Sequence, residues 1–297
     1  QIYKSLGTFD PTVAIDTIER EAISYLFAIP TLFHAMTQAP DYQPYKLRSL
    51  ELILFGGAMI EPELINHINE TWPCMIRHIY GTTETMCSLH NPDPVLSPDR
   101  LRPGFYSRTR VVELNGDSDD LVAPGDEGEL IVDANVDTIF SGYLNQPEAT
   151  AEKVKDGWYY TGDIVRLESD GDVTLIGRID DIIRSGGENI HPEEVEATLE
   201  THASIAECSV VGLADSRWGQ IVIACVVAAG AQPDVAEFDS HFRASTLASF
   251  KRPRGYVFVN DLPKNAAGKV LRRLLRDLVE NKRNEKTPKL HAIKFTN

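Results

Sequence analysis

The first ninety residues alternate between short apolar runs and segments with helical periodicity. The apolar runs over residues 23–29, 50–55 and 75–79 are predicted to form buried strands. Asp10 followed by Pro11 is typical of a helix start, because an acid caps the first turn and proline is tolerated there. Further helices are expected over residues 31–38 and 62–72. This alternation predicts a parallel sheet covered by helices.

From about residue 94 the pattern changes to short strands separated by glycine turns. Strands are expected over residues 129–132, 165–167 and 173–176, the last two joined in a hairpin around Asp170-Gly171. The pattern favours a small, mostly antiparallel β unit. We therefore predict one domain over residues 1–180, with an α/β part (1–93) and a β-rich part (94–180).

A third pattern begins after Asp181 and predicts a small α+β domain over residues 181–280. Pro192 opens a helix in which Val195 and Leu199 share one face. Strands are expected over 209–213, 221–227 and 256–259, with a helix over 237–247. The final helix is expected to bury one stripe and to keep its arginines outside it: Leu271, Leu274, Leu275 and Leu278 against Arg272, Arg273 and Arg276. A polar tail follows over 281–297.

Composition narrows the function classes. The 297 residues carry a net charge of −15, which argues against general nucleic-acid binding. Residues 251–289 nevertheless hold twelve Lys or Arg against four Asp or Glu, so they form either a solvated helix face or a local attractor for a phosphate-rich small molecule. Four scattered cysteines favour reduced thiols in a cytoplasmic protein over a metal or disulfide site. No signal peptide is recognised, and no apolar stretch reaches the ~20 residues of a membrane helix.

Polar residues gather where the predicted parallel strands end, which is where open parallel sheets bind ligands. Gly56 and Gly57 follow the second strand, and residues 80–84 (Tyr-Gly-Thr-Thr-Glu) follow the third. Hydroxyl and backbone N–H groups donate to phosphate oxygens, and a glutamate beside them suits Mg²⁺. The alternative interpretation is a turn that only caps the strand.

Glycines and acids are dense in three later segments, residues 157–163, 177–181 and 185–192. Glycines mark tight turns or close approach to a ligand. The Asp163 carboxylate could accept hydrogen bonds from a ribose diol, although local turn capping is the alternative. Lys269, in a loop, could neutralise charge where two anions meet, although most lysines are only surface residues.

These segments, together with residues 80–84 and 263–269, resemble the acyl-adenylate-forming (AMP-binding) enzymes: acyl-CoA synthetases, adenylation domains and luciferases. The resemblance covers about residues 1–280, and residues 140–147, 185–192 and 213–220 are most similar to benzoate- and chlorobenzoate-type CoA ligases. It implies a two-step ligase. ATP, Mg²⁺ and a carboxylic acid form acyl-AMP and pyrophosphate, and the C-terminal domain then rotates so that the CoA thiol displaces AMP.

The resemblance also implies roles for individual residues. Thr83 would contact the nucleotide phosphate, Glu84 would hold the metal, Tyr80 would lie against adenine, Asp163 and Arg178 would bind ribose, and Lys269 would be catalytic. Asp180 would be the hinge. Further nucleotide contacts are expected from Gly57, Ala58, Gly81 and Thr82, and CoA contacts from Gly186, Gly187, Trp218, Arg252 and Arg254.

The acid would lie among strand ends, in a pocket of Phe27, Gly56, Ile79, Gly81, Met86 and Cys87. Small residues at 56 and 81 are expected to leave space for a flat ring, although Phe27 could equally belong to the core. An aromatic acid such as a (halo)benzoate is the expected substrate. The alternatives are a fatty acid, an adenylation module that loads a carrier protein, and a non-catalytic module whose basic helix meets nucleic acid.

Two family segments are not found: the lysine-containing, Ser/Thr/Gly-rich phosphate loop and the early acyl-pocket segment. Both are expected before Gln1. The chain is therefore expected to be the back part of a larger enzyme and not to form acyl-adenylate alone. A homodimer is left open.

Overall fold

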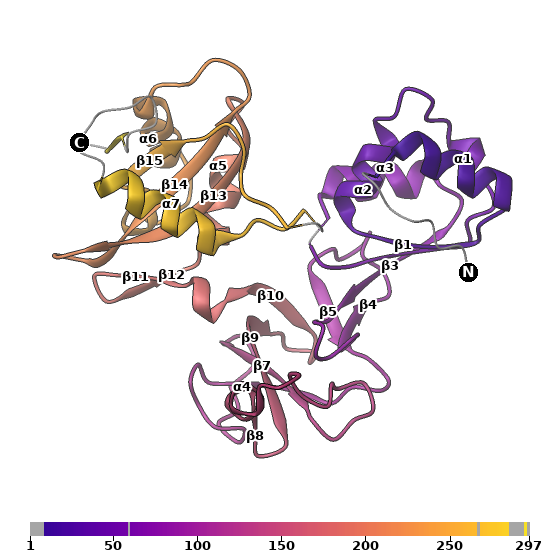
Figure 1. The fold of residues 1–297 in the computed structure, drawn as a ribbon, viewed down its shortest axis with the longest axis horizontal. Coiled ribbons are helices and arrows are strands. Elements are labelled where there is room, and N and C mark those ends of the chain that lie inside the picture. Colours follow the sequence, from indigo (N-terminus) through magenta and orange to yellow (C-terminus); the bar gives the residue numbers. More distant parts are fainter. Residues whose placement is uncertain (1–8, 59, 266–267, 285–293, 296–297) are drawn as a thin grey trace. The chain divides into compact units, whose positions relative to one another are not determined.

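The computed structural model describes residues 9–58, 60–265, 268–284 and 294–295 (Figure 1). The chain forms two compact units, Gln1–Leu175 and Ile176–Asn297. The division falls inside one strand, slightly before the domain boundary predicted from the sequence.

The first unit begins with the predicted alternation of helices and parallel strands. Asp10 accepts a hydrogen bond from the Val13 backbone N–H at 3.1 Å, which confirms it as a helix cap. The three strands pair in parallel in the order β1-β2-β3. The elements are α1 (Pro11–Glu21), β1 (Tyr25–Ala28), α2 (Pro30–Thr37), η1 (Pro44–Leu47), β2 (Leu52–Phe55), α3 (Pro62–Thr71) and β3 (Met75–Tyr80).

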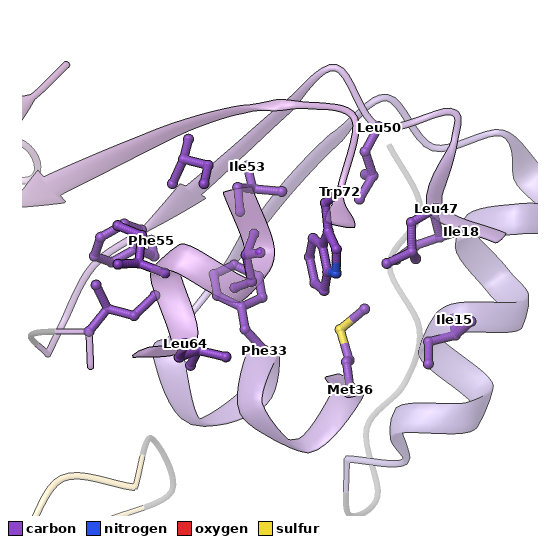
Figure 2. Packing of buried hydrophobic residues seen from close by; sticks show 14 of the residues in the cluster. Ile15, Ile18, Phe33, Met36, Leu47, Leu50, Ile53, Phe55, Leu64 and Trp72 are labelled. Atoms are coloured by element: carbon purple, nitrogen blue, oxygen red, sulfur yellow. The ribbon is translucent and has the colours of Figure 1, made fainter. Parts of the chain in front are cut away.

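Helices α1, α2 and α3 cover one face of these strands (Figure 1). Alternate residues of a strand point to opposite faces, so Ile53 and Phe55 of β2 enter the core beneath the helices (Figure 2). There Phe33 and Trp72 meet edge to face with ring centroids 5.7 Å apart. The helical periodicity read from the sequence therefore corresponds to a real apolar core.

The opposite face of the same strands is largely uncovered among the described residues. Tyr25 and Phe27 of β1 are 63% and 61% exposed, and Met75 of β3 is 55% exposed. Tyr25 pairs with Leu52, and Phe27 with Leu54, so these apolar side chains share one surface. The prediction that β1 is a buried strand is wrong for this chain, because β1 is an edge strand with one face covered.

The sheet of the first unit continues into an antiparallel part, which confirms the predicted β-rich unit. The strand order is β1-β2-β3-β4-β5-β10-β9-β7-β6, with β8 beside β9. Its small core contains Leu89, Leu101, Leu130 and Val165. The elements are β4 (Leu89–Asn91), β5 (Arg100–Pro103), β6 (Thr109–Val112), β7 (Glu127–Asp133), α4 (Pro147–Lys153), β8 (Val154–Lys155), β9 (Trp158–Leu167) and β10 (Val173–Arg178).

The second unit is the predicted α+β domain. Val210 and Val211 are neighbours on β13 and belong to two different apolar clusters, one with α5 and α6 and the other with α7. The sheet order is β12-β11-β14-β15-β16, with β13 beside β14. The elements are η2 (Ile179–Asp181), β11 (Ile183–Ser185), β12 (Glu188–Ile190), α5 (Pro192–Glu200), β13 (Ile205–Asp215), β14 (Gly219–Ala228), α6 (Val235–Ala244), η3 (Ser249–Lys251), β15 (Gly255–Phe258), α7 (Arg272–Asn284) and β16 (Lys294–Phe295).

The predicted apolar stripe of the last helix needs correction. Leu275 and Val279 are fully buried, whereas Leu271 and Leu274 are 36% and 39% exposed. The Arg272 side chain was expected outside the stripe but is only 17% exposed, because it is drawn into a group of carboxylates. In the described part of the chain, the helices are too short or too polar to cross a membrane.

Candidate active site

The turn after β3 is a folded unit held by its own hydroxyl groups. The Thr82 backbone N–H donates to Thr85 Oγ1 at 3.0 Å, and Ser88 Oγ donates to the same oxygen at 2.8 Å. Thr85 and Ser88 are fully buried, and sequence reasoning did not single them out. Thr83, by contrast, is exposed. The buried hydroxyls therefore shape the turn and leave the predicted phosphate contact accessible.

Glu84 is anchored at both its side chain and its backbone. Tyr143 Oη donates to Glu84 Oε1 at 2.8 Å, and the Phe140 backbone N–H donates to the Glu84 carbonyl oxygen at 2.8 Å. Burial alone would raise the pKa of Glu84, but hydrogen bonds from Tyr143 and Thr82 outweigh it and lower the pKa. The carboxylate is therefore charged at neutral pH, as a cation ligand requires.

The donor set around Glu84 fits Mg²⁺ only as a substrate-bridging ion. The described residues contain no cluster of three or more acids, histidines or cysteines that could hold a metal by themselves. Mg²⁺ often takes one or two protein carboxylates and completes its shell with water and phosphate oxygens. One charged carboxylate beside exposed Thr83 suits that arrangement.

Two predicted nucleotide residues, 83 positions apart in the sequence, lie in contact. The Tyr80 hydroxyl donates a hydrogen bond to Asp163 Oδ2. Asp163 is 6% exposed and lies within β9, not in a turn between strands as its glycine-rich segment suggested. It is presented instead by an irregularity in β9, where Gly162 adopts a φ of 74°. The structure thus joins the end of β3 to the middle of β9.

The glycines of the predicted acyl pocket do not leave open space. A Cβ atom at Gly56 would lie 2.6 Å from the Ile79 carbonyl oxygen, and one at Gly81 would lie 1.6 Å from the Met86 carbonyl oxygen. These glycines were expected to make room for a flat ring, but the position of a side chain at each is already filled by backbone atoms, so that reason is wrong. They permit close backbone approach instead.

The remaining residues predicted around the acid and nucleotide are accessible to different extents. Phe27 and Met86 are 61% and 73% exposed, whereas Ile79 and Cys87 are half-buried. Burial raises the pKa of the Cys87 thiol, so it is uncharged at neutral pH. Gly57, with a φ of 81°, and Ala58 form an exposed bend after β2.

In the second unit, four of the predicted CoA residues lie together. Gly186 and Gly187 form the two-residue turn of the β11–β12 hairpin, with φ values of 63° and 91°. The Gly186 backbone N–H donates to the Trp218 carbonyl oxygen at 2.9 Å, and a Cβ atom at Gly186 would lie 2.9 Å from the indole ring. The Arg254 guanidinium lies 4.5 Å from the centroid of the same ring.

Arg217 is a further cation at this tryptophan that sequence reasoning missed. Its guanidinium lies 4.8 Å from the Trp218 ring centroid, and its backbone N–H donates to Asp215 Oδ1 at 2.9 Å. The signal was available, since Arg217 directly precedes Trp218. Arg252, the other predicted CoA residue, is half-buried at the end of η3.

Lys269 is an exposed loop residue, and two hydrogen bonds with Asn265 hold its backbone. The Asn265 backbone N–H donates to the Lys269 carbonyl oxygen at 2.9 Å, and the Lys269 N–H donates to Asn265 Oδ1 at 2.9 Å. Lys264 pairs with Glu207 of β13 at 2.6 Å. Residues 266 and 267, within this motif, lie outside the described residues.

Part of the basic C-terminal segment is neutralised within its own unit. Arg272 contacts Asp181, Glu193 and Glu196 at 3.1, 2.7 and 2.6 Å. Arg276 reaches Asp181 at 2.5 Å. Coulombic attraction to the carboxylates outweighs burial and raises the pKa of Arg272. The segment is therefore not a uniformly free attractor for phosphates.

The same arginines anchor the segment that follows β10. Arg276 donates to the Asp180 backbone carbonyl oxygen at 3.0 Å, while the Asp180 side chain is exposed. Arg178 ends β10 in the second unit. The roles of Arg178 in ribose binding and of Asp180 as a hinge stay predictions.

Comparison with known proteins places this arrangement in a family. A model of the AMP-binding enzyme family matches residues 2–144, and a model of the AMP-binding enzyme C-terminal domain matches residues 194–269. The chain belongs to the AMP-binding enzymes, the family that the sequence motifs resembled.

Individual relatives agree with the expected subgroup. The chain is 44% identical to a 4-chlorobenzoate–CoA ligase of Arthrobacter sp., over 97% of this chain and 55% of the relative. It is 33% identical to a feruloyl-CoA synthase of Amycolatopsis sp., over 90% of this chain and 54% of the relative. The chain thus spans about half the length of these relatives.

Solved structures agree as well. ATP-bound MatB from Rhodopseudomonas palustris superposes with a TM-score of 0.82 at 28% identity, covering 92% of this chain and 54% of that one. The o-succinylbenzoate CoA synthetase of Bacillus subtilis, in complex with its acyl-adenylate intermediate, gives a TM-score of 0.77 at 26% identity, covering 91% and 54%. The expected fold class is confirmed.

Proposed function

We propose that this chain is part of an ATP-dependent carboxylic acid–CoA ligase. The first step joins a carboxylate to the α-phosphate of ATP, which releases pyrophosphate and forms acyl-AMP. The second transfers the acyl group to the CoA thiol and releases AMP. The observation that carries the proposal is the contact of Tyr80 with Asp163 in a member of the AMP-binding enzymes.

The first unit supplies the proposed nucleotide site. Tyr80 and Asp163 meet adenine and ribose, Thr83 meets the phosphates, and Glu84 ligates Mg²⁺. Bound Mg²⁺ would neutralise charge on the phosphate oxygens. The charged state of Glu84 and the exposure of Thr83 support this assignment. Further contacts are proposed for Gly57, Ala58, Gly81, Thr82 and, from the second unit, Arg178.

The second unit supplies a lysine for one step and a thiol-carrier site for the other. Lys269 is proposed to neutralise the carboxylate and the α-phosphate as they approach. Two hydrogen bonds between Asn265 and the Lys269 backbone fix the position from which the lysine side chain extends, which supports this role. CoA is proposed to pass Gly186, Gly187 and Trp218, with its phosphates on Arg252 and Arg254. Rotation about Asp180 would separate the steps.

An aromatic acid is the proposed substrate. The relatives include enzymes named for 4-chlorobenzoate, ferulate and indoleacetate. They also include a fatty acid–[acyl-carrier-protein] ligase and a long-chain-fatty-acid–CoA ligase, both at 34% identity, so these two activities are the alternatives. The exposed apolar side chains of Phe27 and Met86 are the proposed walls for the ring.

The complete enzyme is proposed to contain polypeptide beyond this chain. The chain spans about half of its relatives, and one apolar face of the β1–β3 sheet is largely uncovered by the residues that the structure describes, although parallel sheets are normally covered on both faces. We therefore propose that the 297 residues alone do not form acyl-adenylate. Acid-dependent pyrophosphate release by this chain alone would contradict that. A cytoplasmic location, where ATP and CoA are available, is part of the proposal.

A panel of acids tests the function. AMP formation by the complete enzyme would be measured with benzoate, 4-chlorobenzoate, ferulate, indoleacetate, octanoate and hexadecanoate, each with and without CoA. We expect CoA-dependent AMP formation, with the highest kcat/KM for an aromatic acid. A higher kcat/KM for a fatty acid would overturn the substrate class, and release of AMP without any requirement for CoA would overturn the ligase.

A further inference from the structure

The irregularity that presents Asp163 is a bulge between β7 and β9. Glu129 pairs with Ile164, and the next regular pair is Ile131 with Tyr160. Residues 161–163 of β9 therefore lie opposite Leu130 alone. Such a bulge leaves backbone groups without ladder partners and redirects the side chains beside it.

Side chains replace the hydrogen bonds that the ladder loses. Glu129 Oε1 accepts from the Gly162 backbone N–H at 2.9 Å. Thr161 Oγ1 donates to the Leu130 carbonyl oxygen at 2.7 Å and accepts from the Asp163 backbone N–H at 3.0 Å. All three side chains, Glu129, Thr161 and Asp163, are nearly inaccessible to solvent. The bulge is thus a built feature with its polar groups satisfied.

Glu129 is an unusual residue for its place. It is 6% exposed in a strand whose neighbouring residues 130–132 are fully buried apolar side chains. Burial raises the pKa of Glu129, opposed by the hydrogen bond from Gly162 and by attraction to Lys153 and Lys155, while the negative charge of Asp163 adds to the rise. Burying a carboxyl group is costly unless it bonds to something. The hydrogen bond from the Gly162 N–H offsets part of that cost and indicates what the Glu129 side chain does here.

We infer that Glu129 is a positioning residue of the nucleotide site, which holds the Gly162 bulge and so aims the Asp163 carboxylate toward Tyr80. The role of Asp163 toward ribose rests on the proposed function, whereas the hold on the bulge does not. The geometry requires an acceptor oxygen at the end of the side chain and not its charge. Glutamine at position 129 should therefore preserve the hold on the bulge. Leucine, of similar bulk but without an oxygen, should lose it.

The first test follows the Gly162 amide directly in the 297-residue chain. Hydrogen exchange, read by NMR, would be compared among wild type, Glu129→Gln, Glu129→Leu and the control Glu127→Leu. Glu127 lies on the same strand as Glu129, and its loss breaks an ion pair with Arg166 near the surface. Loss of one hydrogen bond should speed exchange of Gly162 about tenfold in Glu129→Leu. Glu129→Gln and Glu127→Leu should match wild type. Unchanged exchange in Glu129→Leu would overturn the inference.

The second test asks whether the bulge affects nucleotide binding through the contact between Asp163 and the ribose hydroxyls. Calorimetry would measure the Kd of AMP and of 2′,3′-dideoxy-AMP for the same variants. Glu129→Leu should weaken AMP about tenfold, as expected for losing hydrogen bonds to a charged group, and leave the dideoxy analogue unchanged. Equal weakening of both ligands would show a merely structural role and overturn positioning.

The two proposals fail in different ways. If the wild-type chain does not distinguish AMP from its dideoxy analogue, the ribose role of Asp163 fails, and the Gly162 exchange rates still decide whether Glu129 holds the bulge. If Glu129→Leu does not fold, Glu129→Met, which keeps the length without the oxygen, takes its place in both tests.

Discussion

At the residue scale, the site is defined by what each polar group bonds to and not by its identity alone. Glu84 and Glu129 are both partly or wholly buried glutamates, yet hydrogen bonds lower the pKa of the first and burial raises that of the second. Glu84 is only half-buried and accepts hydrogen bonds from Tyr143 and Thr82, whereas burial dominates at Glu129 and the charge of Asp163 adds to its effect. Environment therefore separates a proposed cation ligand from a positioning residue.

Removing the Tyr143 hydroxyl should weaken the proposed Mg²⁺ site. In Tyr143→Phe the Glu84 carboxylate loses its 2.8 Å hydrogen bond, so its orientation is no longer fixed and its pKa rises. We expect the Mg²⁺ concentration at half-maximal adenylation by the complete enzyme to increase about tenfold, the scale of one hydrogen bond to a charged group. Tyr106→Phe, at an exposed tyrosine, is the control and should not change it.

His78 should make folding sensitive to mild acid. It is buried, stacked on Phe55 with ring centroids 4.5 Å apart, and burial lowers its pKa to about 4. The unfolded chain takes up a proton below pH ~6.5 but the folded chain does not, so stability is complete above that pH and declines as pH falls towards 4. At pH 5 the loss should be about 2 kcal/mol.

Urea unfolding at pH 7.5 and pH 5 checks this. His78→Phe should lose that part of the pH dependence and keep its stability at pH 7.5, because the buried Nδ1 has no hydrogen-bond partner among the residues that the structure describes. The exposed His34→Gln should behave as wild type. An unchanged pH dependence in His78→Phe would show that other groups cause it.

Some residues of the candidate site could be predicted from the sequence and others could not, for a physical reason. Tyr80 and Asp163, which the structure brings into contact, could be singled out because each lies in a dense local motif. Glu129 could not, since an acid in a strand pattern looks like a solvent-facing position. Only the register of β7 against β9 reveals it, and that register depends on pairing between distant segments.

At the scale of elements, local signals worked where local chemistry decides the structure. The starts of α1 and α5 were predicted from proline and acids and are confirmed. Strands β11 and β12 were missed because three-residue strands beside Gly186-Gly187 carry no recognisable alternation. The face of α7 was misjudged because a helical stripe cannot show that distant carboxylates bind Arg272.

Arg272 should be a main support of the second unit. Removing it leaves Asp181, Glu193 and Glu196 close together without their shared cation, and breaking a buried ion pair on one side costs about 3 kcal/mol. Arg272→Met should therefore speed hydrogen exchange of the β13 and β14 amides strongly. Arg273→Met, at an exposed neighbour on the same helix, should leave these amides protected. Equal protection in both variants would remove Arg272 from this role.

At the scale of the whole molecule, the fold class and the family could be predicted from the order of motifs. The strand order of the ten-stranded sheet could not, because β10 pairs on one side with β9, which directly precedes it, but on the other side with β5, which is far away in sequence. Spacing alone also could not show that Gly56 and Gly81 are packed against backbone.

The two steps of the proposed reaction should separate between variants of the second unit. Lys269→Ala should slow adenylation by about a hundredfold or more, the scale of one electrostatic contact in a transition state, and spare thioester formation from supplied acyl-AMP. Gly186→Ala should do the reverse, since a Cβ atom there would press on the Trp218 ring. Stopped-flow or quench assays of each half-reaction give the answer. Equal losses in both halves for both variants would contradict a division of labour.

The face of the β1–β3 sheet that the described residues leave largely uncovered has a practical consequence for work with this polypeptide. This face is an exposed apolar surface, of the kind that binds hydrophobic dyes and promotes aggregation. It includes Tyr25, Phe27, Leu54 and Met75. Anilinonaphthalene sulfonate should therefore fluoresce brightly with the isolated chain, and Phe27→Glu should dim it. Keeping the preparation in solution should depend on covering that surface with mild detergent.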